Sequence, residues 1–538
     1  MFRTNDQHKQ QTLLESTQWM NLKIKEKLEK SWAPIFYEQV FCHIDEQPFS
    51  ILYSNTGTPN FPVNILLGLE YIKHMKNISD AELLDDFYFD YLVNYAVGIR
   101  TLGETHLAER TLYYFRERIY QYTLKNPKGE DLLFGQFKNL LKNFAEKASI
   151  HMNEQRTDTT MFMSNIKKAG RISLAYDVLV KAVKAIPENS RTENLKKVLE
   201  PSFKTETLYH AKAQENDGKL IILLNLCREA LEILNMLPNT NKSEAQRILS
   251  RFIREQTTTD TNGELLPKQN KEISSGSLQS AYDEDATHRT KGNKSQSGYV
   301  LGIAETCGPD NPFQLITDYT IETNNTSDVA ILKNRMEAIH DTGCKDLYAD
   351  GGYYSNDVAE EAETNKIKMH LTDMTGKKTT KKLPVTDFEI DEKTNLINKC
   401  PGGHTPTRVA KSDGQSTAHM PHSACENCPL KEQCYVKRQK KDYSLRINLK
   451  SIIAGRERVK IQEFKKENTS KRAGIEGTNS ALKRKGHAKL NVCGITKISI
   501  VSALKVAAQN ICRVTKYLLG GYKSKKKPSY GIFMPIPA

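Results

Sequence analysis

The chain has 538 residues, of which 38% are hydrophobic and 26% are charged, so it has the composition of a folded protein of about two to four domains. The richest apolar run, 220–224, is far shorter than the 18 or more residues that a membrane span needs. Residues 1–7 lack the apolar core of a signal peptide. We therefore expect a cytoplasmic protein with no membrane partner.

Positive charge is concentrated near the C-terminus. Residues 431–538 contain 26 Lys and Arg against 6 Asp and Glu, whereas the whole chain carries only +14. The rest of the chain is therefore slightly acidic. A basic surplus confined to one region favours a polyanionic partner such as nucleic acid, although a solvated basic surface would show the same pattern.

Residues 1–125 have helical spacing. Helices are expected over 12–30, after Pro62, after the capping-box sequence at Ser79–Glu82 and over 111–122. This pattern suits a small DNA-binding or dimerisation module. A generic helical bundle has the same periodicity.

The middle of the chain alternates between strand and helix signals. A strand is expected within 150–163, followed by helices over 171–253 and a polar linker over 255–280. The later elements are listed here in chain order: strands at 298–304 and 313–323, a helix at 327–340, a strand at 347–350, a helix capped by Ser355, Asn356 or Asp357, and a strand at 367–371. This order predicts a mixed α/β sheet with a helical insertion after its first strand.

The C-terminal third begins with a segment, 375–455, that is rich in Lys, Thr, Pro, Gly and Cys. Helix is expected from about Ile461 to about Leu519, with interruptions at Gly486 and Gly494. The basic tail, which contains Lys523 and Lys525, is expected to be mobile.

Three acidic residues stand in positions that suit metal-dependent chemistry. Asp158 is placed at the end of the first strand, and Asp350 follows a later strand and precedes Gly351 and Gly352. Glu476 lies within the basic region. Each has an ordinary alternative: Asp158 and Asp350 as turn residues, and Glu476 as a surface ion-pair partner.

The surroundings of Glu476 add to this pattern. Arg472 precedes it by four residues and Lys483 follows it by seven, so a continuous helix would present all three side chains on one face. Such a face can hold a metal ion and grip phosphate. Rival acidic residues are Glu154, Asp283 and Asp285.

Several segments resemble the DDE transposases of bacterial insertion sequences. They are Thr58–Leu69, Glu109–Arg116, Ala349–Ser355 and the run from Arg472 through Glu476 to Lys483, together with Asp285–Gly292 continuing to Tyr299. The family pattern around the glutamate begins with Tyr, and this chain has Thr469 there. That departure leaves the glutamate carboxylate intact. It puts in doubt only a contact that the Tyr makes to DNA in the family. The cations of 285–292 suit phosphate contacts or an ordinary basic hairpin equally.

The resemblance implies an RNase H-like catalytic core that cuts and joins double-stranded DNA. Asp158, Asp350 and Glu476 would hold two Mg²⁺ (or Mn²⁺) ions, which activate water or a DNA 3′-hydroxyl and stabilise the leaving oxygen. Arg472 and Lys483 would orient phosphates. The partners would be element ends with terminal inverted repeats, target DNA and a second copy of the chain, with no small-molecule substrate and a cytoplasmic, nucleoid-associated location.

The expected domains combine these observations, and they are listed here in full: a helical DNA-binding or dimerisation domain at 1–125, a catalytic domain made of 145–170, 281–375 and 456–518, a helical insertion with linker at 171–280, a Cys-rich insertion at 376–455 and a basic tail at 519–538.

Four of the ten cysteines form a pattern with the spacing of a zinc site, namely Cys400, Cys425, Cys428 and Cys434. A structural Zn²⁺ would stabilise a segment with little apolar core of its own. Unpaired thiols or a redox pair at Cys425 and Cys428 are alternatives, and His404, His419 or His422 lie near enough to replace one cysteine. Similar Cys-rich inserts occur in a branch of the transposase family, which supports the structural zinc.

The sequence thus predicts a DDE transposase. The alternative is an inactivated or domesticated transposase that binds DNA without cutting it, and the two are distinguished by whether all three carboxylates remain. A structural zinc protein without a nucleic-acid partner fits the charge distribution poorly.

Overall fold

The computed structural model describes the following residues: 1–10, 15–127, 129–167, 170–208, 216–237, 243–259, 265–291, 294–373, 382–412 and 414–521. Two compact units make up the chain. Unit 1 contains Met1–His151, Thr159–Ser327 and the chain from Gly477, and unit 2 contains Met152–Asp158 and Asp328–Glu476. The basic tail beyond residue 521 lies outside the described residues.

Unit 1 begins with a helical region, as the sequence predicts. Its helices are α1 (Leu22–Glu29), α2 (Trp32–Gln39), α3 (Val63–Lys76), α4 (Asp80–Phe89), α5 (Tyr91–Ala96), α6 (Glu109–Lys125) and α7 (Leu132–Ala148). The predicted capping box is present, because Ser79 and Glu82 exchange hydrogen bonds at the start of α4. The predicted helix over 12–30 is wrong in its extent, since its described α-helical part is only α1.

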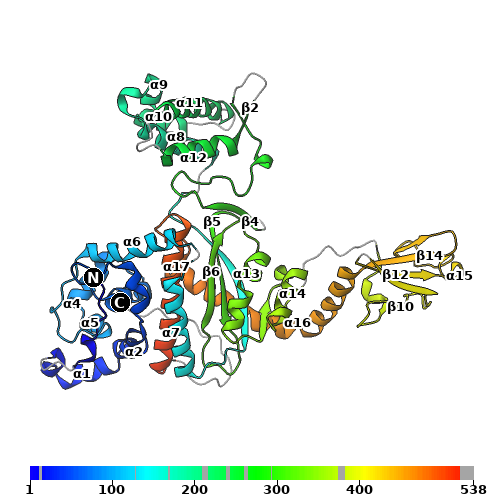
Figure 1. The fold of residues 1–538 in the computed structure, drawn as a ribbon, viewed down its shortest axis with the longest axis horizontal. Helices are drawn as coiled ribbons and strands as arrows, with labels where there is room; N and C mark the ends of the chain where they lie inside the picture. Colours follow the sequence, from blue (N-terminus) through cyan, green and yellow to red (C-terminus); the bar gives the residue numbers. More distant parts are fainter. Residues whose placement is uncertain are drawn as a thin grey trace. The chain divides into compact units, whose positions relative to one another are not determined.

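The core of unit 1 forms around the last helix of the described residues. Helix α17 (Ile495–Leu518) packs against α3, α7 and the strand β6 (Ile316–Thr323), and Figure 1 shows α7 and α17 side by side. Strand β6 pairs antiparallel with β5 (Lys294–Thr306), which also pairs antiparallel with β4 (Thr287–Lys291). Residues 287–291 and 294–298 pair as the two arms of a hairpin, and phosphate contact by its cations stays a prediction.

Helices are present where the sequence predicts them over 171–253, and they share a core of their own. They are α8 (Arg171–Ala185), α9 (Glu193–Lys197), α10 (Pro201–Leu208), α11 (Asn216–Met236) and α12 (Ser243–Gln256), whose buried side chains include Leu179, Leu223 and Leu249. The 255–280 segment differs from the linker that was predicted, because β2 (Thr257–Thr259) and β3 (Leu265–Pro267) pair within it.

Strand β1 (Glu154–Phe162) begins in unit 2 and ends in unit 1. Its first residues belong to unit 2, where it pairs in parallel with β7 (Asp346–Ala349), and β7 pairs in parallel with β8 (Lys368–Leu371). The strand order is β4-β5-β1-β7-β8, with β6 also on β5. Helices α13 (Asp328–Asp341) and α14 (Asn356–Thr364) connect these strands, and Ser355 caps α14 as expected. The fold is therefore mixed α/β, as predicted.

The Cys-rich segment folds as a small β structure. Its elements are β9 (Glu389–Ile390), β10 (Ile397–Lys399), β11 (Arg408–Ser412), β12 (Gln415–Met420), α15 (His422–Cys425), β13 (Val436–Arg438) and β14 (Tyr443–Asn448). Tyr443, Leu445 and Ile447 of β14 supply part of its own apolar core. The sequence pattern underestimated this core because its apolar residues alternate with polar ones along short strands.

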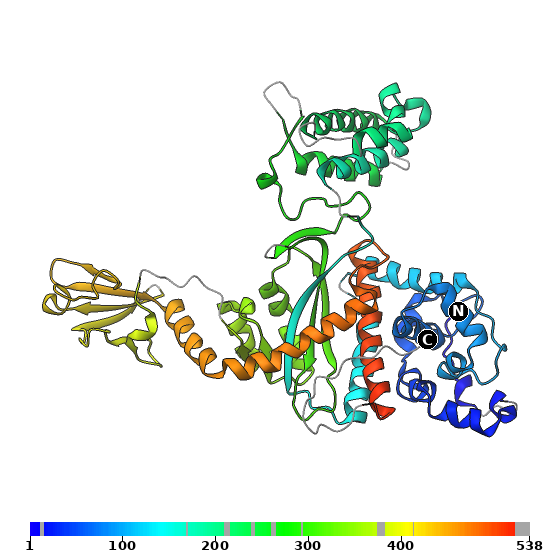
Figure 2. The same ribbon diagram turned by 180° about the vertical axis from the view of Figure 1, so that it is seen from behind.

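One long helix follows directly. Helix α16 (Leu449–Leu482) starts twelve residues before the predicted Ile461, because polar and charged residues on its first turns hide its periodicity. Figure 2 shows it as a single continuous helix. A π-helical turn, Lys483–His487, ends it at Gly486, whose φ is +81°, and Gly494 precedes α17 with a φ of +84°. The two predicted interruptions are confirmed.

Candidate active site

The two aspartates are positioned by neighbouring parallel strands, β1 and β7. Arg156 of β1 is the register partner of Tyr348 of β7. Asp158 and Asp350 each follow two residues later, so the register sets the two carboxylates opposite each other. Asp350 comes directly after β7, as predicted, and accepts a hydrogen bond from the Gly352 amide at 2.7 Å. Asp158 lies in the middle of β1, whereas the sequence pattern put it at the strand end.

Glu476 of α16 is connected to the two aspartates by Arg472, which contacts all three carboxylates. The Arg472 Nη2 atom lies 3.2 Å from Asp158 Oδ2 and 3.7 Å from Asp350 Oδ2. Its Nη1 atom donates to Glu476 Oε1 at 3.1 Å. One guanidinium therefore contacts all three predicted carboxylates, which come from two strands and one helix of unit 2.

Three carboxylates share the single positive charge of Arg472. Arg472 is largely buried, with a side chain 19% exposed, and its Nε atom has no hydrogen-bond partner. Asp158 is buried, whereas the Glu476 side chain is 65% exposed, so the cluster opens to solvent at Glu476. Hard divalent cations prefer such carboxylate oxygens. Among the described residues, no group of three or more Asp, Glu, His or Cys side chains has an arrangement that could hold a metal ion. Here the carboxylates surround a guanidinium instead.

Lys471 fixes the helix to both strands, and the sequence analysis missed it. Its Nζ atom contacts Glu154 Oε2 of β1 and Tyr348 Oη of β7, both at 2.9 Å. Although burial opposes it, hydrogen bonding to Tyr348 and Glu154 raises the pKa of Lys471 above its ordinary value. Glu154, a rival candidate, is thus engaged in this contact. Neither its type nor its spacing distinguishes Lys471 from the other lysines near it in the sequence.

The remaining candidates belong to unit 1. Lys483 is exposed and begins the π-helical turn just after α16. In unit 1, Asp283 accepts a hydrogen bond from the Tyr299 hydroxyl at 2.6 Å, and Asp285 accepts one from the Ile495 amide at 3.0 Å. These two rival aspartates therefore stabilise the fold of unit 1.

A second contact network begins just past Glu476, within unit 1. The Thr478 hydroxyl donates to Glu305 Oε2 at 2.6 Å, and Arg513 of α17 forms an ion pair with the same carboxylate at 3.1 Å. Glu305 is fully buried on β5. This network anchors the end of α16 to the core of unit 1. It joins residues more than 170 positions apart, so no local pattern predicts it.

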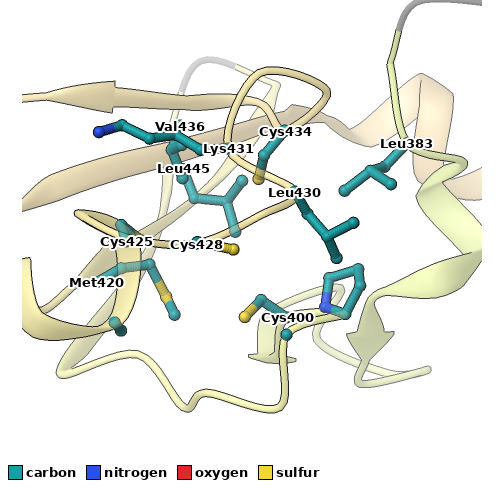
Figure 3. A pocket seen from close by; sticks show the side chains of 13 residues that line it. Leu383, Cys400, Met420, Cys425, Cys428, Leu430, Lys431, Cys434, Val436 and Leu445 are labelled. Atoms are coloured by element: carbon teal, nitrogen blue, oxygen red, sulfur yellow. The ribbon is translucent and has the colours of Figure 1, made fainter.

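The four predicted cysteines surround one small cavity of about 20 Å³ in the Cys-rich part of unit 2 (Figure 3). A Cβ on Gly402 would lie 3.7 Å from the Sγ atoms of both Cys400 and Cys428, so these thiols face the same point. Burial, and then the neighbouring thiols, raise the pKa of Cys425 to about 11.

The rival histidines differ in their surroundings. His404 lies beside the cavity, since its Cδ2 atom is 3.6 Å from that same Cβ position of Gly402. His419 Nδ1 is engaged by Asp442 at 2.8 Å, and the His422 ring packs edge-on against Tyr443. The four cysteines therefore line one cavity, and His404 lies next to Gly402 in its wall.

Comparison with known families identifies the chain. Residues 399–515 match the model of a transposase DDE domain, which covers Arg472, Glu476 and all four clustered cysteines. Residues 23–118 match a transposase domain (DUF772). The chain belongs to the insertion-sequence DDE transposases. The two matches support DNA transposition as its general function and imply that it binds DNA.

Two of the three candidate carboxylates lie outside the matched segments of this transposase, namely Asp158 and Asp350. Their assignment to the site rests on the geometry around Arg472. Neither the search of curated proteins nor the search of solved structures gave a match. No helix in the described part of the transposase is long and apolar enough to cross a membrane.

Proposed function

We propose that this transposase cuts DNA at the terminal inverted repeats of its element and joins the ends to target DNA, using Asp158, Asp350 and Glu476 as metal-binding carboxylates. The observation that carries the proposal is their meeting on one guanidinium, that of Arg472. Carboxylates that repel one another gather in this way only around positive charge. These three residues would hold Mg²⁺ or Mn²⁺, which would supply an activated oxygen nucleophile and stabilise the leaving oxygen.

In the proposed reaction water first attacks a phosphodiester at the element end. The bond from phosphorus to the 3′ oxygen breaks, which leaves a 3′-hydroxyl and a 5′-phosphate. That 3′-hydroxyl then attacks a phosphodiester of the target, so one bond forms as another breaks. Neither step needs a covalent bond to the protein.

Arg472 has a positioning role in this proposal. Its guanidinium contacts all three carboxylates, so it would have to turn aside for a divalent cation to bind between them. The open side of the cluster, at Glu476, faces solvent, and there a guanidinium can grip a phosphate with two parallel hydrogen bonds. Lys483 would add a second phosphate contact.

The fold supports an RNase H-like catalytic core. Strands β1, β7 and β8 are parallel neighbours, β5 and β6 form an antiparallel hairpin, and the helical insertion follows β1. The proposed domains stay as the sequence predicts them: 1–125 for DNA binding or dimerisation, three segments for catalysis, 171–280 and 376–455 as insertions. Because two element ends must be joined in one reaction, a homodimer on DNA is part of the proposal.

The cysteine cluster is proposed to hold one structural Zn²⁺. Cys400, Cys425, Cys428 and Cys434 would hold this ion, because all four thiols line one cavity and four ligands complete a tetrahedron. A complete set of protein ligands leaves no position for substrate, so this site would stabilise the Cys-rich insertion and take no part in catalysis.

The test is cleavage of duplex DNA carrying the inverted repeats that flank the transposase gene. Purified protein with Mg²⁺ or Mn²⁺ should nick the element end, and Asp158→Asn, Asp350→Asn and Glu476→Gln should each abolish nicking while DNA binding persists. Glu463→Gln, on an exposed face of α16, is the matched control. Binding by the wild-type chain without any cleavage would favour the non-enzymatic alternative, and undiminished cleavage by a variant would remove its carboxylate from the site.

A further inference from the structure

A groove of about 840 Å³ runs within unit 1 between the two segments that match transposase families. One wall comes from α3, the start of α4 and α6, and the other comes from residues 486–505. Helix α3 packs directly on α17 beneath it. Both family-matched segments therefore contribute to the groove. Its two walls are far apart in the sequence, so no local motif predicts it.

The cations of one wall are neutralised by carboxylates. Lys73 pairs with Asp80 at 2.7 Å, and Arg116 pairs with both Glu70 and Asp80 at 2.6 Å. This network leaves little charge for a ligand. It does hold the backbone of α3, α4 and α6 in place around the groove.

The other wall has cations without carboxylate partners. Lys489, Lys497 and Lys505 line it, and among the described residues none of the three forms an ion pair. The Lys497 ammonium lies 4.8 Å from the ring centroid of Tyr120, and the side chains of Lys489 and Lys497 are exposed to solvent.

Lys505 lies at the bottom of the groove. It is only 8% exposed, and its Nζ atom donates to the Lys485 carbonyl oxygen at 2.6 Å and to Asn77 Oδ1 at 3.4 Å. Burial, and then repulsion by Lys73 and Lys485, lower its pKa to about 8. The buried His74 next to it has a pKa held well below its ordinary value by burial and then by Lys505, Lys73 and Arg116.

A buried ammonium without a carboxylate is costly in the free protein, and an anion that enters the groove relieves that cost. Lysines at the mouth and floor of one groove, with tyrosines on the facing wall, match a sugar–phosphate backbone in charge and in hydrogen-bonding groups. We infer that this groove binds the phosphate backbone of double-stranded DNA through Lys489, Lys497 and Lys505. The inference needs the DNA-binding role of the transposase but not the proposed cleavage chemistry.

The test measures binding of an unrelated 30-base-pair duplex, by fluorescence anisotropy in buffer without divalent metal, over a series of salt concentrations. The double variant Lys489→Gln/Lys497→Gln should bind more weakly and should lower the slope of log affinity against log salt by about 0.9 for each lysine removed. Lys505→Met should also lower this slope. Lys27→Gln, an exposed lysine of α1 far along the chain from the groove, is the control.

Each outcome decides the matter. Wild-type affinity and slope in the double variant would overturn the inference, and so would a loss seen with an RNA duplex but not with DNA. Thermal unfolding checks each variant, and if Lys505→Met fails to fold, the two exposed lysines decide alone. Because no cleavage is measured, failure here leaves the carboxylate site untouched, and failure of the cleavage assay leaves this groove untouched.

Discussion

The guanidinium of Arg156 lies against the backbone of Gly474, in the space where any other residue would have its Cβ atom. Its Nη1 atom donates to the Lys471 carbonyl oxygen at 2.7 Å, inside the helix that carries Glu476. Arg156 is two residues before Asp158 on β1. This contact therefore joins the strand of the first carboxylate to the helix of the third, and it explains the glycine two residues before Glu476.

Gly474→Ala should push the Arg156 guanidinium aside and break its hydrogen bond to α16. We expect a loss of about 1–3 kcal/mol in unfolding free energy, as for other overpacked sites, together with reduced cleavage. Thermal and denaturant unfolding measure the first effect.

The matched control is Gly477→Ala on the same helix. No atom lies within 4 Å of a Cβ placed at Gly477, so alanine there should be neutral or stabilise by up to about 1 kcal/mol. Equal effects of the two substitutions would refute the role given to the Arg156 contact.

Arg513→Met should be strongly destabilising, because it leaves the buried Glu305 carboxylate without its cation. The expected loss is about 3–5 kcal/mol of unfolding free energy. Adding Glu305→Gln in the same chain should restore part of it, since the uncompensated charge is then gone. If the double variant is no more stable than Arg513→Met alone, the pair does not hold the end of α16 as described.

Cys428→Ser should remove zinc from the purified transposase. Wild-type protein should contain roughly one zinc per chain by elemental analysis, and the variant should contain markedly less. Cys42→Ser, an exposed cysteine of unit 1, should retain the metal. Zinc-free wild-type protein would contradict the proposed cluster, and retention of zinc by Cys428→Ser but not by a His404→Ala variant would move the fourth ligand to the histidine.

Arg472→Gln should act in the opposite direction from the carboxylate variants on metal binding. Its guanidinium competes for the space between the carboxylates, so removing it should strengthen Mn²⁺ binding severalfold while turnover falls because phosphate is no longer held. Isothermal titration with Mn²⁺ gives the first effect and the cleavage assay gives the second. Weaker Mn²⁺ binding in this variant would mean that Arg472 supports the metal instead of competing with it.

Local patterns predicted much of the fold. The capping box at Ser79, the strand before Asp350 and the breaks at Gly486 and Gly494 each depend on a few adjacent residues, and each is present. The start of α16 and the core of the Cys-rich segment were missed, because polar turns and short alternating strands give weak periodicity.

The candidate site likewise has parts that the sequence predicted and parts that it did not. The residue types and the chain order predicted Asp158, Asp350 and Glu476 as partners, and the geometry around Arg472 supports that assignment. The contacts around them, made by Lys471 and Arg156, join segments more than 100 residues apart. Only the folded chain shows such contacts, because nothing near these residues in the sequence marks their partners.

The most direct test of the central claim is a Mn²⁺ titration of the purified transposase, followed by electron paramagnetic resonance, with the three carboxylates changed one at a time. Asp158→Asn, Asp350→Asn and Glu476→Gln should each weaken Mn²⁺ binding by more than the ~10- to 100-fold that even an outer-shell partner contributes, and Glu463→Gln should bind like wild type. Wild-type Mn²⁺ affinity in all three carboxylate variants would contradict the claim that these residues form one metal site.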